Sequence, residues 1–197
     1  MTLANIITLT RIALIPCFVL AVTYYAQSVQ HGTPESWEHA LAILFFTLAA
    51  STDALDGYLA RRLNQKSRLG TILDPIADKA LLVTALILLS WNHGDAFDQL
   101  PLWFPIVIIS RDVIVVLGVA VVFMMGKGLH VQPHWIGKVA TVLQMITAGL
   151  VLIRVPSLYW TLPMWIAGVF TVISGVIYVI QGSYKVGHEE APQSGKL

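Results

Sequence analysis

Long apolar stretches recur along the chain and are separated by short polar breaks. A helix that crosses a bilayer needs about 20 mainly apolar residues, and about 17 at the short end. Because a continuous helix satisfies its own backbone hydrogen bonds in lipid, each sufficiently long stretch predicts one such helix. The chain has six: Leu3–Ala26, Ala40–Arg61, Gly70–Trp91, Leu102–Met125, Ile136–Ile153 and Tyr159–Ile180. The pattern therefore predicts an all-α integral membrane protein with six transmembrane helices.

The composition supports lipid as the main solvent. Of the 197 residues, 56% are hydrophobic and only 12% are charged, whereas a soluble domain carries about 25% charged residues. The net charge of +1 gives no case for a nucleic-acid partner. The pattern predicts one membrane domain, residues 1–186, and a polar tail, 187–197, that is expected to be disordered. The one cysteine, Cys17, lies in an apolar run and is expected to be a small buried side chain.

Lysine and arginine are concentrated on one side of the predicted helices. The turn between the second and third helices, 61–68, holds four of them, and the others on that side follow the fourth and sixth helices. The loops 27–39 and 92–101 on the opposite side hold none, and Arg154 stands there alone. Since basic loops stay in the cytoplasm, both termini and the 61–68 turn are expected to face it.

Four aspartates flank this basic turn. Asp53 and Asp56 are three residues apart in the second predicted helix, and Asp74 and Asp78 are four apart in the third, so each pair lies on one helix face. Two antiparallel helices joined by a short turn would bring the four carboxylates together just inside the membrane. Inserting one aspartate costs up to about 2.5–3.5 kcal/mol, and converging carboxylates repel one another. One or two bound divalent cations would resolve both problems, and carboxylate oxygens suit Mg²⁺ or Mn²⁺.

The alternative is structural, because a lone aspartate in a membrane helix can cap a helix or form a buried ion pair. Four such residues would need four basic partners, and the third predicted helix offers only Lys79. The residues after Asp53 favour a ligand site. Gly57 and Ala60 continue its face without bulk, although small residues also serve helix packing, and Arg61 ends the strip with a guanidinium suited to phosphate.

Together these residues form a long pattern, D-x-x-D-G-x-x-A-R-x8-G-x3-D-x3-D, which runs from Asp53 to Asp78. The pattern resembles the signature of the CDP-alcohol phosphotransferase family. An Asn-x-x-Thr-x-x-Arg pattern at Asn5, Thr8 and Arg11 extends the resemblance to the first helix. The resemblance implies an enzyme of phospholipid biosynthesis that transfers a phosphatidyl group from CDP-diacylglycerol to a glycerol-type acceptor and releases CMP. It further implies two ions of Mg²⁺ or Mn²⁺, a homodimer, and an active site on the cytoplasmic face of the bacterial inner membrane.

The resemblance also assigns a role to each residue of the pattern. Asp53, Asp56 and Asp74 would hold the metals, and Asp78 would contribute to one of them. Asp78 would also be the general base that deprotonates the acceptor hydroxyl. The residues that would bind the donor, CDP-diacylglycerol, are Asn5, Thr8, Gly57, Ala60, Arg61 and Ser67.

Two cations in apolar surroundings, Arg111 and Lys138, are candidates for binding the acceptor. Matching positions form an anion pocket in family members with a phosphorylated acceptor, and the alternative is a structural ion pair to another helix. Asp112 is adjacent in sequence, faces elsewhere on the helix and is expected to be a poor partner for Arg111. If the fourth helix ends at Gly126, Arg111 lies about 20 Å from that end. Either that helix projects into the cytoplasm or Arg111 is not at the acceptor site.

The acceptor itself stays open between glycerol 3-phosphate and phosphatidylglycerol. Family members that use glycerol 3-phosphate usually carry a second arginine seven residues after the first, where this chain has Gly118. A singly charged diester needs fewer cation contacts than a phosphomonoester dianion, so the missing arginine favours phosphatidylglycerol. Glycerol 3-phosphate is still preferred, because it is the commonest bacterial acceptor among enzymes this similar.

Two other classes of membrane protein carry acidic residues in their helices. An intramembrane prenyltransferase has its aspartate motifs far apart in sequence, and a cation transporter spreads acidic residues across the bilayer or shows repeat symmetry. In this chain the four aspartates of the pattern lie within the stretch from Asp53 to Asp78, at one edge of the predicted membrane region. The pattern therefore favours the phosphatidyl transfer.

Overall fold

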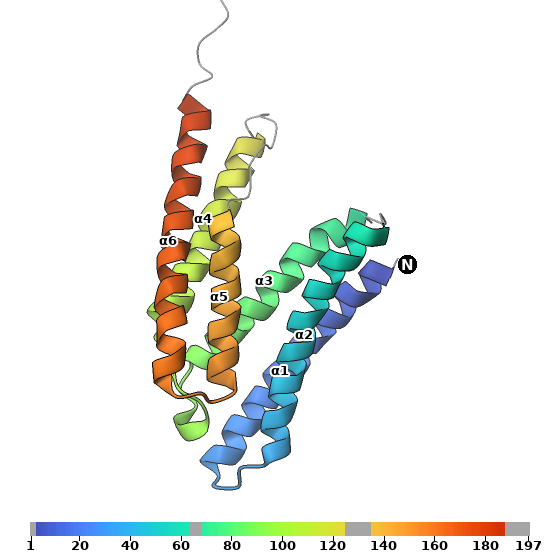
Figure 1. Cartoon of the computed structure of the whole chain (residues 1–197), viewed down its shortest axis with the longest axis vertical. Coiled ribbons are helices and arrows are strands. Elements are labelled where there is room, and N and C mark those ends of the chain that lie inside the picture. The colour runs from blue at the N-terminus through green and yellow to red at the C-terminus, as the bar shows by residue number, and fades with distance from the viewer. Residues whose placement is uncertain (1–2, 64–67, 125–134, 188–197) are drawn as a thin grey trace, which may run out of the picture.

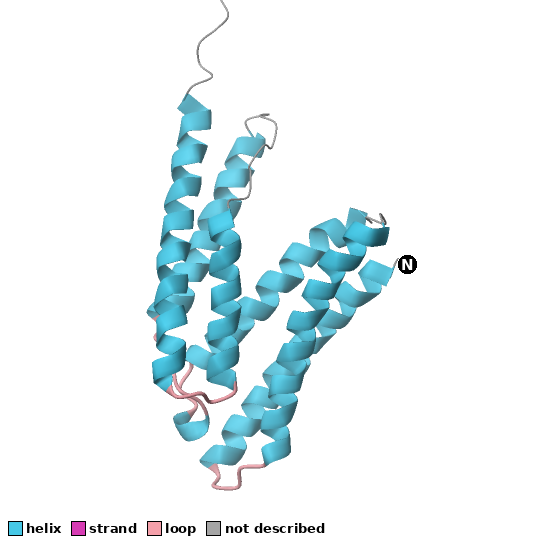
Figure 2. Cartoon of the chain, in the orientation of Figure 1, coloured by secondary structure: helices cyan, strands magenta, loops and turns pink. Residues whose placement is uncertain are grey.

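The computed structural model describes residues 3–63, 68–124 and 135–187. Within these ranges the chain forms six α-helices and one short 3₁₀ helix, joined by loops and with no strand (Figure 2). The elements are α1 (Leu3–Gln30), α2 (Ser36–Leu63), α3 (Arg68–Ser90), η1 (Gly94–Ala96), α4 (Trp103–Met124), α5 (Trp135–Leu152) and α6 (Ser157–Gly187). The prediction of an all-α chain is confirmed for the described residues, and each predicted stretch falls on one α-helix, with ends that differ by up to seven residues.

The α-helices form two groups, and helices that follow each other in sequence run in opposite directions (Figure 1). α1 packs against α2 and α3, and α6 packs against α4 and α5. α3 links the groups, because it also contacts α4 and α5. The groups lie close together at the end that holds η1 and diverge toward the opposite end, which holds the start of α1, the end of α2 and the end of α6. Both described ends of the chain therefore lie at the same end of the molecule as the basic turn.

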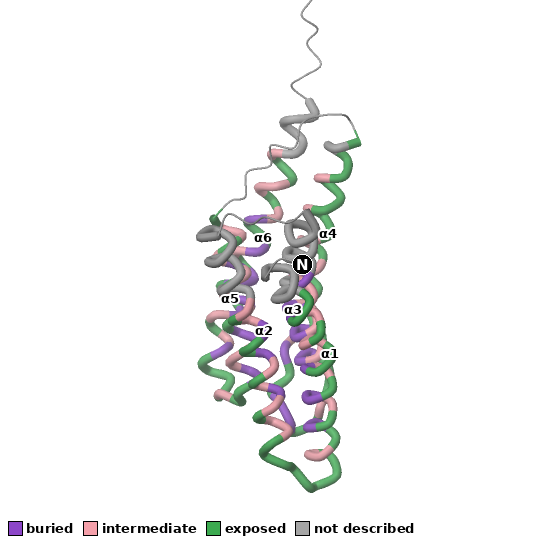
Figure 3. Tube along the Cα trace, turned by 90° about the vertical axis from the view of Figure 1, so that its right-hand side faces the viewer, coloured by how far each residue is buried: buried purple, intermediate pink, exposed green. Residues whose placement is uncertain are grey.

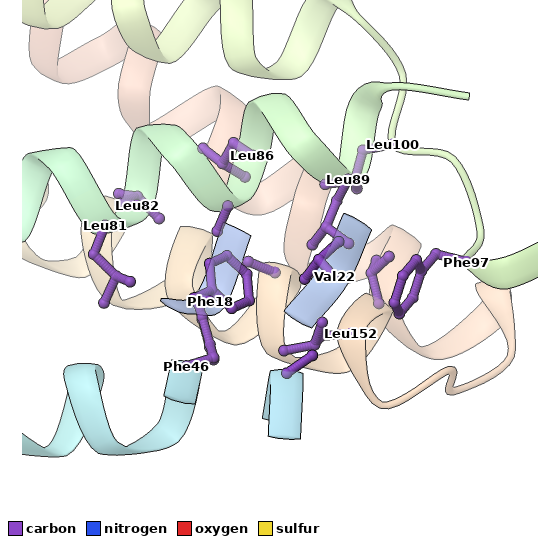
Figure 4. Packing of buried hydrophobic residues seen from close by; sticks show 14 of the residues in the cluster. Phe18, Val22, Phe46, Leu81, Leu82, Leu86, Leu89, Phe97, Leu100 and Leu152 are labelled. Carbon is purple, nitrogen blue, oxygen red and sulfur yellow. The ribbon is translucent and has the colours of Figure 1, made fainter. Parts of the chain in front are cut away.

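Aromatic and leucine side chains fill the contact between α1, α2, α3 and α5 (Figure 4). The rings of Phe18 and Phe46 lie 5.7 Å apart, and Leu86 and Leu152 complete the cluster with 1% or less of their surface exposed. Small buried residues let the helix backbones approach one another: Ala21, Ala42, Ala49, Ala85 and Ala148. Because lipid tails are as apolar as these side chains, close packing rather than removal from water holds the helices together.

The outer surface is rich in large apolar side chains. Figure 3 shows exposed positions recurring along the helices. Val116 of α4 and Leu162 of α6 are each 66% exposed, and their neighbours along both helices are similar. A continuous apolar exterior of this kind needs lipid around it. Four segments of the described chain are long and apolar enough to cross a membrane, namely Leu9–Gln30, Trp103–Val121, Trp135–Leu152 and Ser157–Gln181. The protein is therefore a membrane protein.

Cys17 lies on this exterior, so the prediction that it is buried is wrong. In a helix that meets lipid, an apolar run contains outward-facing residues as well as packed ones. Its hydrophobicity therefore does not distinguish the two.

Polar contacts join the helices at the η1 end. Arg154 directly follows the last turn of α5 and adopts a left-handed conformation with φ 58°. Its guanidinium donates to the Tyr25 hydroxyl of α1 at 2.9 Å and to the Asp95 carbonyl of η1 at 3.1 Å. The His39 ring of α2 stacks on Tyr25 and lies 2.8 Å from the Leu152 carbonyl oxygen. Arg154, the one lysine or arginine in the loops on this side of the predicted helices, therefore connects segments that are far apart in sequence.

Candidate active site

The four aspartates of the sequence pattern lie on α2 and α3, the two helices that the basic turn connects. Asp53 and Asp56 fall in the last turns of α2, and Asp74 and Asp78 fall in the first turns of α3. Both segments are helical, so each pair lies one turn apart on its helix. α2 and α3 contact each other, and these turns lie at the same end of the molecule (Figure 1). The structure describes the backbone at these positions but not the side chains.

The residues assigned to the donor surround these turns in the fold. Gly57, Ala60 and Arg61 follow Asp56 on α2, and Asn5 and Thr8 lie in the first turns of α1. α1 packs against both α2 and α3 and begins at the same end of the molecule (Figure 1). Of these residues too, only the backbone is described. The one remaining donor residue, Ser67, lies outside the described residues.

Among the side chains that the structure does describe, no three histidines, cysteines, aspartates or glutamates are grouped closely enough to hold a metal. The side chains of the four aspartates on α2 and α3 are not among those described, and the metal site stays a prediction.

Arg111 is described in full, and it lies between α4, α5 and α6. Its Nη1 donates to Asp112 Oδ1 at 2.9 Å, and its Nη2 donates to Ser174 Oγ of α6 at 2.7 Å. The guanidinium carbon lies 5.2 Å from the ring centroid of Tyr178, at the distance of a cation–π contact. The prediction that Asp112 is a poor partner for Arg111 is wrong. An arginine side chain is long enough to fold back onto a neighbour whose Cβ points elsewhere.

Two glycines leave room for the Arg111 side chain. A Cβ at Gly137 of α5 would lie 2.8 Å from Arg111 Nη2 and 3.2 Å from Ser174 Oγ. A Cβ at Gly175 of α6 would lie 3.2 Å from Arg111 Cγ. Because any other residue would crowd the guanidinium or its stem, these positions fix where the cation can sit.

Lys138, the second acceptor candidate, directly follows Gly137 in the first turn of α5 and is exposed. The structure therefore brings the start of α5, and with it Lys138, next to Arg111. Since the start of α5 lies beside Arg111, α4 continues past this level by about 20 Å to Met124. Figure 1 shows α4 and α6 extending beyond the start of α5. Whether this part of α4 projects into the cytoplasm is not tested by the fold, and both expected arrangements stay predictions.

An ion pair that sequence reasoning did not find lies beside this group. Lys79 Nζ of α3 is 2.7 Å from Asp112 Oδ2 of α4, with 39% and 19% of the two side chains exposed. Lys79 was the only basic partner that the third helix offered to the aspartates, and here it pairs across to α4. The sequence shows both residues as charges inside apolar helices, but it does not show that their helices are neighbours.

Gly118, two turns after Arg111 on α4, is exposed, and a Cβ there would meet nothing within 4 Å. This position faces open space.

Comparison with known proteins adds to this geometry. The sequence model of the CDP-alcohol phosphatidyltransferases matches residues 1–173, which run from α1 into α6. A Bacillus subtilis protein named CDP-diacylglycerol–glycerol-3-phosphate 3-phosphatidyltransferase is 36% identical over 194 residues, covering 89% of this chain and 92% of its own. Proteins of the same name from Blochmanniella floridana and Escherichia coli are each 37% identical. They cover 84% and 76% of this chain, and 80% and 76% of their own length.

Proposed function

The chain belongs to the CDP-alcohol phosphatidyltransferase family, and on that premise we propose that it transfers a phosphatidyl group from CDP-diacylglycerol to glycerol 3-phosphate. The observation that carries the proposal is the position of the two aspartate pairs. They occupy adjoining ends of two contacting helices, within the region that the family model covers. The relatives with 36% and 37% identity carry this activity in their names.

The side chains of the four aspartates are suitable ligands for a divalent metal. Four carboxylates on two neighbouring helices supply hard oxygen ligands, and Asp53, Asp56, Asp74 and Asp78 would hold Mg²⁺ or Mn²⁺, two ions in all. When bound, the metals would neutralise charge on the diphosphate and on the departing CMP.

The protein's own groups would carry the transfer as follows. Asp78 accepts the proton of the acceptor hydroxyl, whose oxygen then bonds to the phosphorus that bears the diacylglycerol. The bond from that phosphorus to the CMP oxygen breaks, and CMP leaves with the electron pair. Gly57 and Ala60 would border the cytidine, and Arg61, Ser67, Asn5 and Thr8 would line the rest of the donor site.

Arg111 and Lys138 would bind the phosphate of the acceptor. Both lie on the α4–α6 side of the molecule, and Lys138 follows Gly137, the α5 residue that lies against Arg111. An arginine held by Ser174 and Asp112 keeps its guanidinium in one orientation, which favours recognition of a phosphate.

Phosphatidylglycerol is the second candidate acceptor, and the product would then be cardiolipin. The open space at Gly118 favours it, because a bulky acceptor would meet no side chain there.

We further propose that all six α-helices cross the bacterial inner membrane, with both termini and the active site on the cytoplasmic side. The end of the molecule that holds both described chain ends also holds the basic turn between α2 and α3, in agreement with the positive-inside rule. A homodimer is proposed from the family resemblance alone.

The test is a product assay with the purified protein. Incubation with CDP-diacylglycerol and glycerol 3-phosphate should give phosphatidylglycerophosphate and CMP. Activity should vanish in excess EDTA and return with Mg²⁺ or Mn²⁺. If the protein forms cardiolipin from phosphatidylglycerol and no phosphatidylglycerophosphate from glycerol 3-phosphate, phosphatidylglycerol is the acceptor. Full activity in EDTA would contradict the role of the aspartates.

A further inference from the structure

A chain of charged contacts runs across three helices, from α3 through α4 to α6. Lys79 Nζ of α3 lies 2.7 Å from Asp112 Oδ2, Asp112 Oδ1 accepts from Arg111 Nη1 at 2.9 Å, and Arg111 Nη2 donates to Ser174 Oγ of α6 at 2.7 Å. Asp112 therefore joins two cations, one from each helix group. The proposed chemistry has used Asp112 and Ser174 only as supports of Arg111, and it has given Lys79 no role.

These charged contacts lie between the two groups of helices, next to residues of the proposed active site. α3 contacts both helices α4 and α5 of the other group, and its first turns lie with α1 and α2 where the groups diverge (Figure 1). Lys79 directly follows Asp78 on α3, and Asp112 directly follows Arg111 on α4. The ion pair therefore joins the residue next to the proposed base to the residue next to the proposed acceptor-binding arginine.

An exposed ion pair would contribute little, typically 0–1 kcal/mol, and would deserve no role. Asp112 is different, because 81% of its side chain is buried and it lies on a helix whose other exposed faces are apolar. Here a charge is costly unless it is paired, so the pair restricts where α3 and α4 can lie relative to each other. Loss of Lys79 alone still leaves Asp112 paired with Arg111, so that change should not leave an isolated buried charge.

We propose that Lys79 and Asp112 are positioning residues for the transfer. Their ion pair sets the turn of α3 that carries Asp78 at a fixed place relative to α4, and so holds the general base against the acceptor bound at Arg111. The inference rests on the proposed function, since it takes Asp78 as base and Arg111 as acceptor ligand. It adds a further requirement: the Lys79–Asp112 pair, which touches neither substrate, must hold α3 and α4 at a fixed position relative to each other.

The consequence is a change in turnover rather than in donor binding. A misplacement of about 1 Å between reacting groups can lower a rate about a hundredfold. Lys79→Met and Asp112→Asn should each lower kcat by about tenfold to a hundredfold, with the KM for CDP-diacylglycerol changed by less than about twofold. Because both remove one shared contact, the double variant should lose about as much as the more affected single variant. Lys79→Arg, which keeps the charge and the reach, should restore most of kcat.

The experiment measures kcat, both KM values and the thermal unfolding midpoint for the wild type and these four variants in one detergent. Arg154→Ala is the matched control, because it removes a cation that ties helices at the η1 end. It should lower the unfolding midpoint and leave kcat unchanged. Variants of Lys79 and Asp112 that unfold earlier but keep wild-type kcat, or whose losses in kcat multiply in the double variant, would overturn the inference.

The outcomes separate this inference from the proposed function. If the wild type forms no phosphatidyl product from CDP-diacylglycerol, the proposed function fails. If the wild type forms it and Lys79→Met turns over equally fast, only the positioning role fails.

Discussion

Arg111 illustrates how a charge is accommodated among the apolar helices of this protein. Its stem passes Gly175 of α6 and its guanidinium passes Gly137 of α5, and the guanidinium contacts Asp112, Ser174 and the Tyr178 ring. Such a long side chain buries its methylene groups while its guanidinium finds polar partners. The cation is therefore held in place before any acceptor arrives.

This arrangement predicts a specific effect of Gly137→Ala. The added Cβ would lie 2.8 Å from Arg111 Nη2, so the guanidinium must move and give up its bond to Ser174. If Arg111 binds the acceptor, the loss of one charge-assisted contact, about 1.5–3 kcal/mol, should raise the acceptor KM roughly tenfold or more. The KM for CDP-diacylglycerol should stay unchanged.

Gly118→Ala is the matched control, since it makes the same change on α4 where nothing lies within 4 Å. Steady-state kinetics of both variants with each substrate varied in turn would check the prediction. Equal acceptor KM values in the two variants would place the acceptor away from Arg111.

The aspartates should divide their work in a way that substitution can reveal. Asp78→Asn removes the proposed base while three carboxylates remain to hold metal, so turnover should fall to background and donor affinity should change little. Asp53→Asn should weaken metal and donor binding together. Calorimetric titration with CDP-diacylglycerol in the presence of Mg²⁺ checks the difference, and equal losses of affinity would contradict it.

At the scale of single residues, the sequence predicted positions better than partners. The spacing of Asp53, Asp56, Asp74 and Asp78 predicted helical pairs correctly, because helix geometry alone fixes which residues lie a turn apart. The same rule misjudged Asp112, because it describes Cβ directions and not the reach of an arginine. The pair that Lys79 forms with α4 could not be predicted, since it depends on which helices are neighbours.

Between elements, one buried polar contact joins α5 to α6. Gln144 Nε2 donates to Thr171 Oγ1 at 2.7 Å, and both residues are 3% or less exposed. Gln144 Oε1 is buried with no hydrogen-bond partner among the described residues. The hydrogen bond therefore comes with an unmatched acceptor on the same side chain.

Substituting one partner should consequently change the stability more than substituting the other. Thr171→Val leaves the Gln144 amide unpaired as well, so it should lower the free energy of unfolding by about 1–3 kcal/mol. Gln144→Leu removes the unmatched oxygen together with the bond and should be close to neutral. Thermal unfolding in detergent measures both. A Leu variant that is as destabilised as the Val variant would show that the hydrogen bond itself, and not its unmatched groups, sets the balance.

The sequence predicted the helices well and their ends less well. The predicted stretch Ala40–Arg61 corresponds to α2, Ser36–Leu63, and Tyr159–Ile180 corresponds to the longer α6, Ser157–Gly187. Hydrophobicity marks the part of a helix that suits lipid, whereas backbone hydrogen bonds continue the helix into polar sequence. The predicted domain end at residue 186 lies within the last turn of α6, and residues 188–197 lie outside the described part of the chain.

In the whole molecule, the arrangement of the helices was beyond the sequence. A soluble helix shows its packed side as an apolar stripe, but here the side that meets lipid is apolar as well. The hydrophobic periodicity therefore did not indicate that α3, besides packing on α1 and α2, also contacts α4 and α5. The polar residues are better guides, since the Lys79–Asp112 pair and the contacts of Arg154 join helices or loops far apart in sequence.

Arg154 allows the tie at the η1 end to be tested separately from the active site. Its side chain donates to Tyr25 and to the Asp95 carbonyl, while its backbone has φ 58°, which costs a non-glycine residue about 1–2 kcal/mol. Arg154→Ala loses both hydrogen bonds and keeps the strain, whereas Arg154→Gly loses the same bonds and relieves it. Both variants should unfold earlier than the wild type, and the alanine variant should be less stable than the glycine variant by about 1 kcal/mol.

Because the proposed active site lies at the other end of the molecule, kcat at a temperature where each variant is folded should match the wild type (Figure 1). An alanine variant at least as stable as the glycine variant would show that the left-handed backbone at this position carries no cost, and a fall in kcat would show that the η1 end controls the distant helix ends.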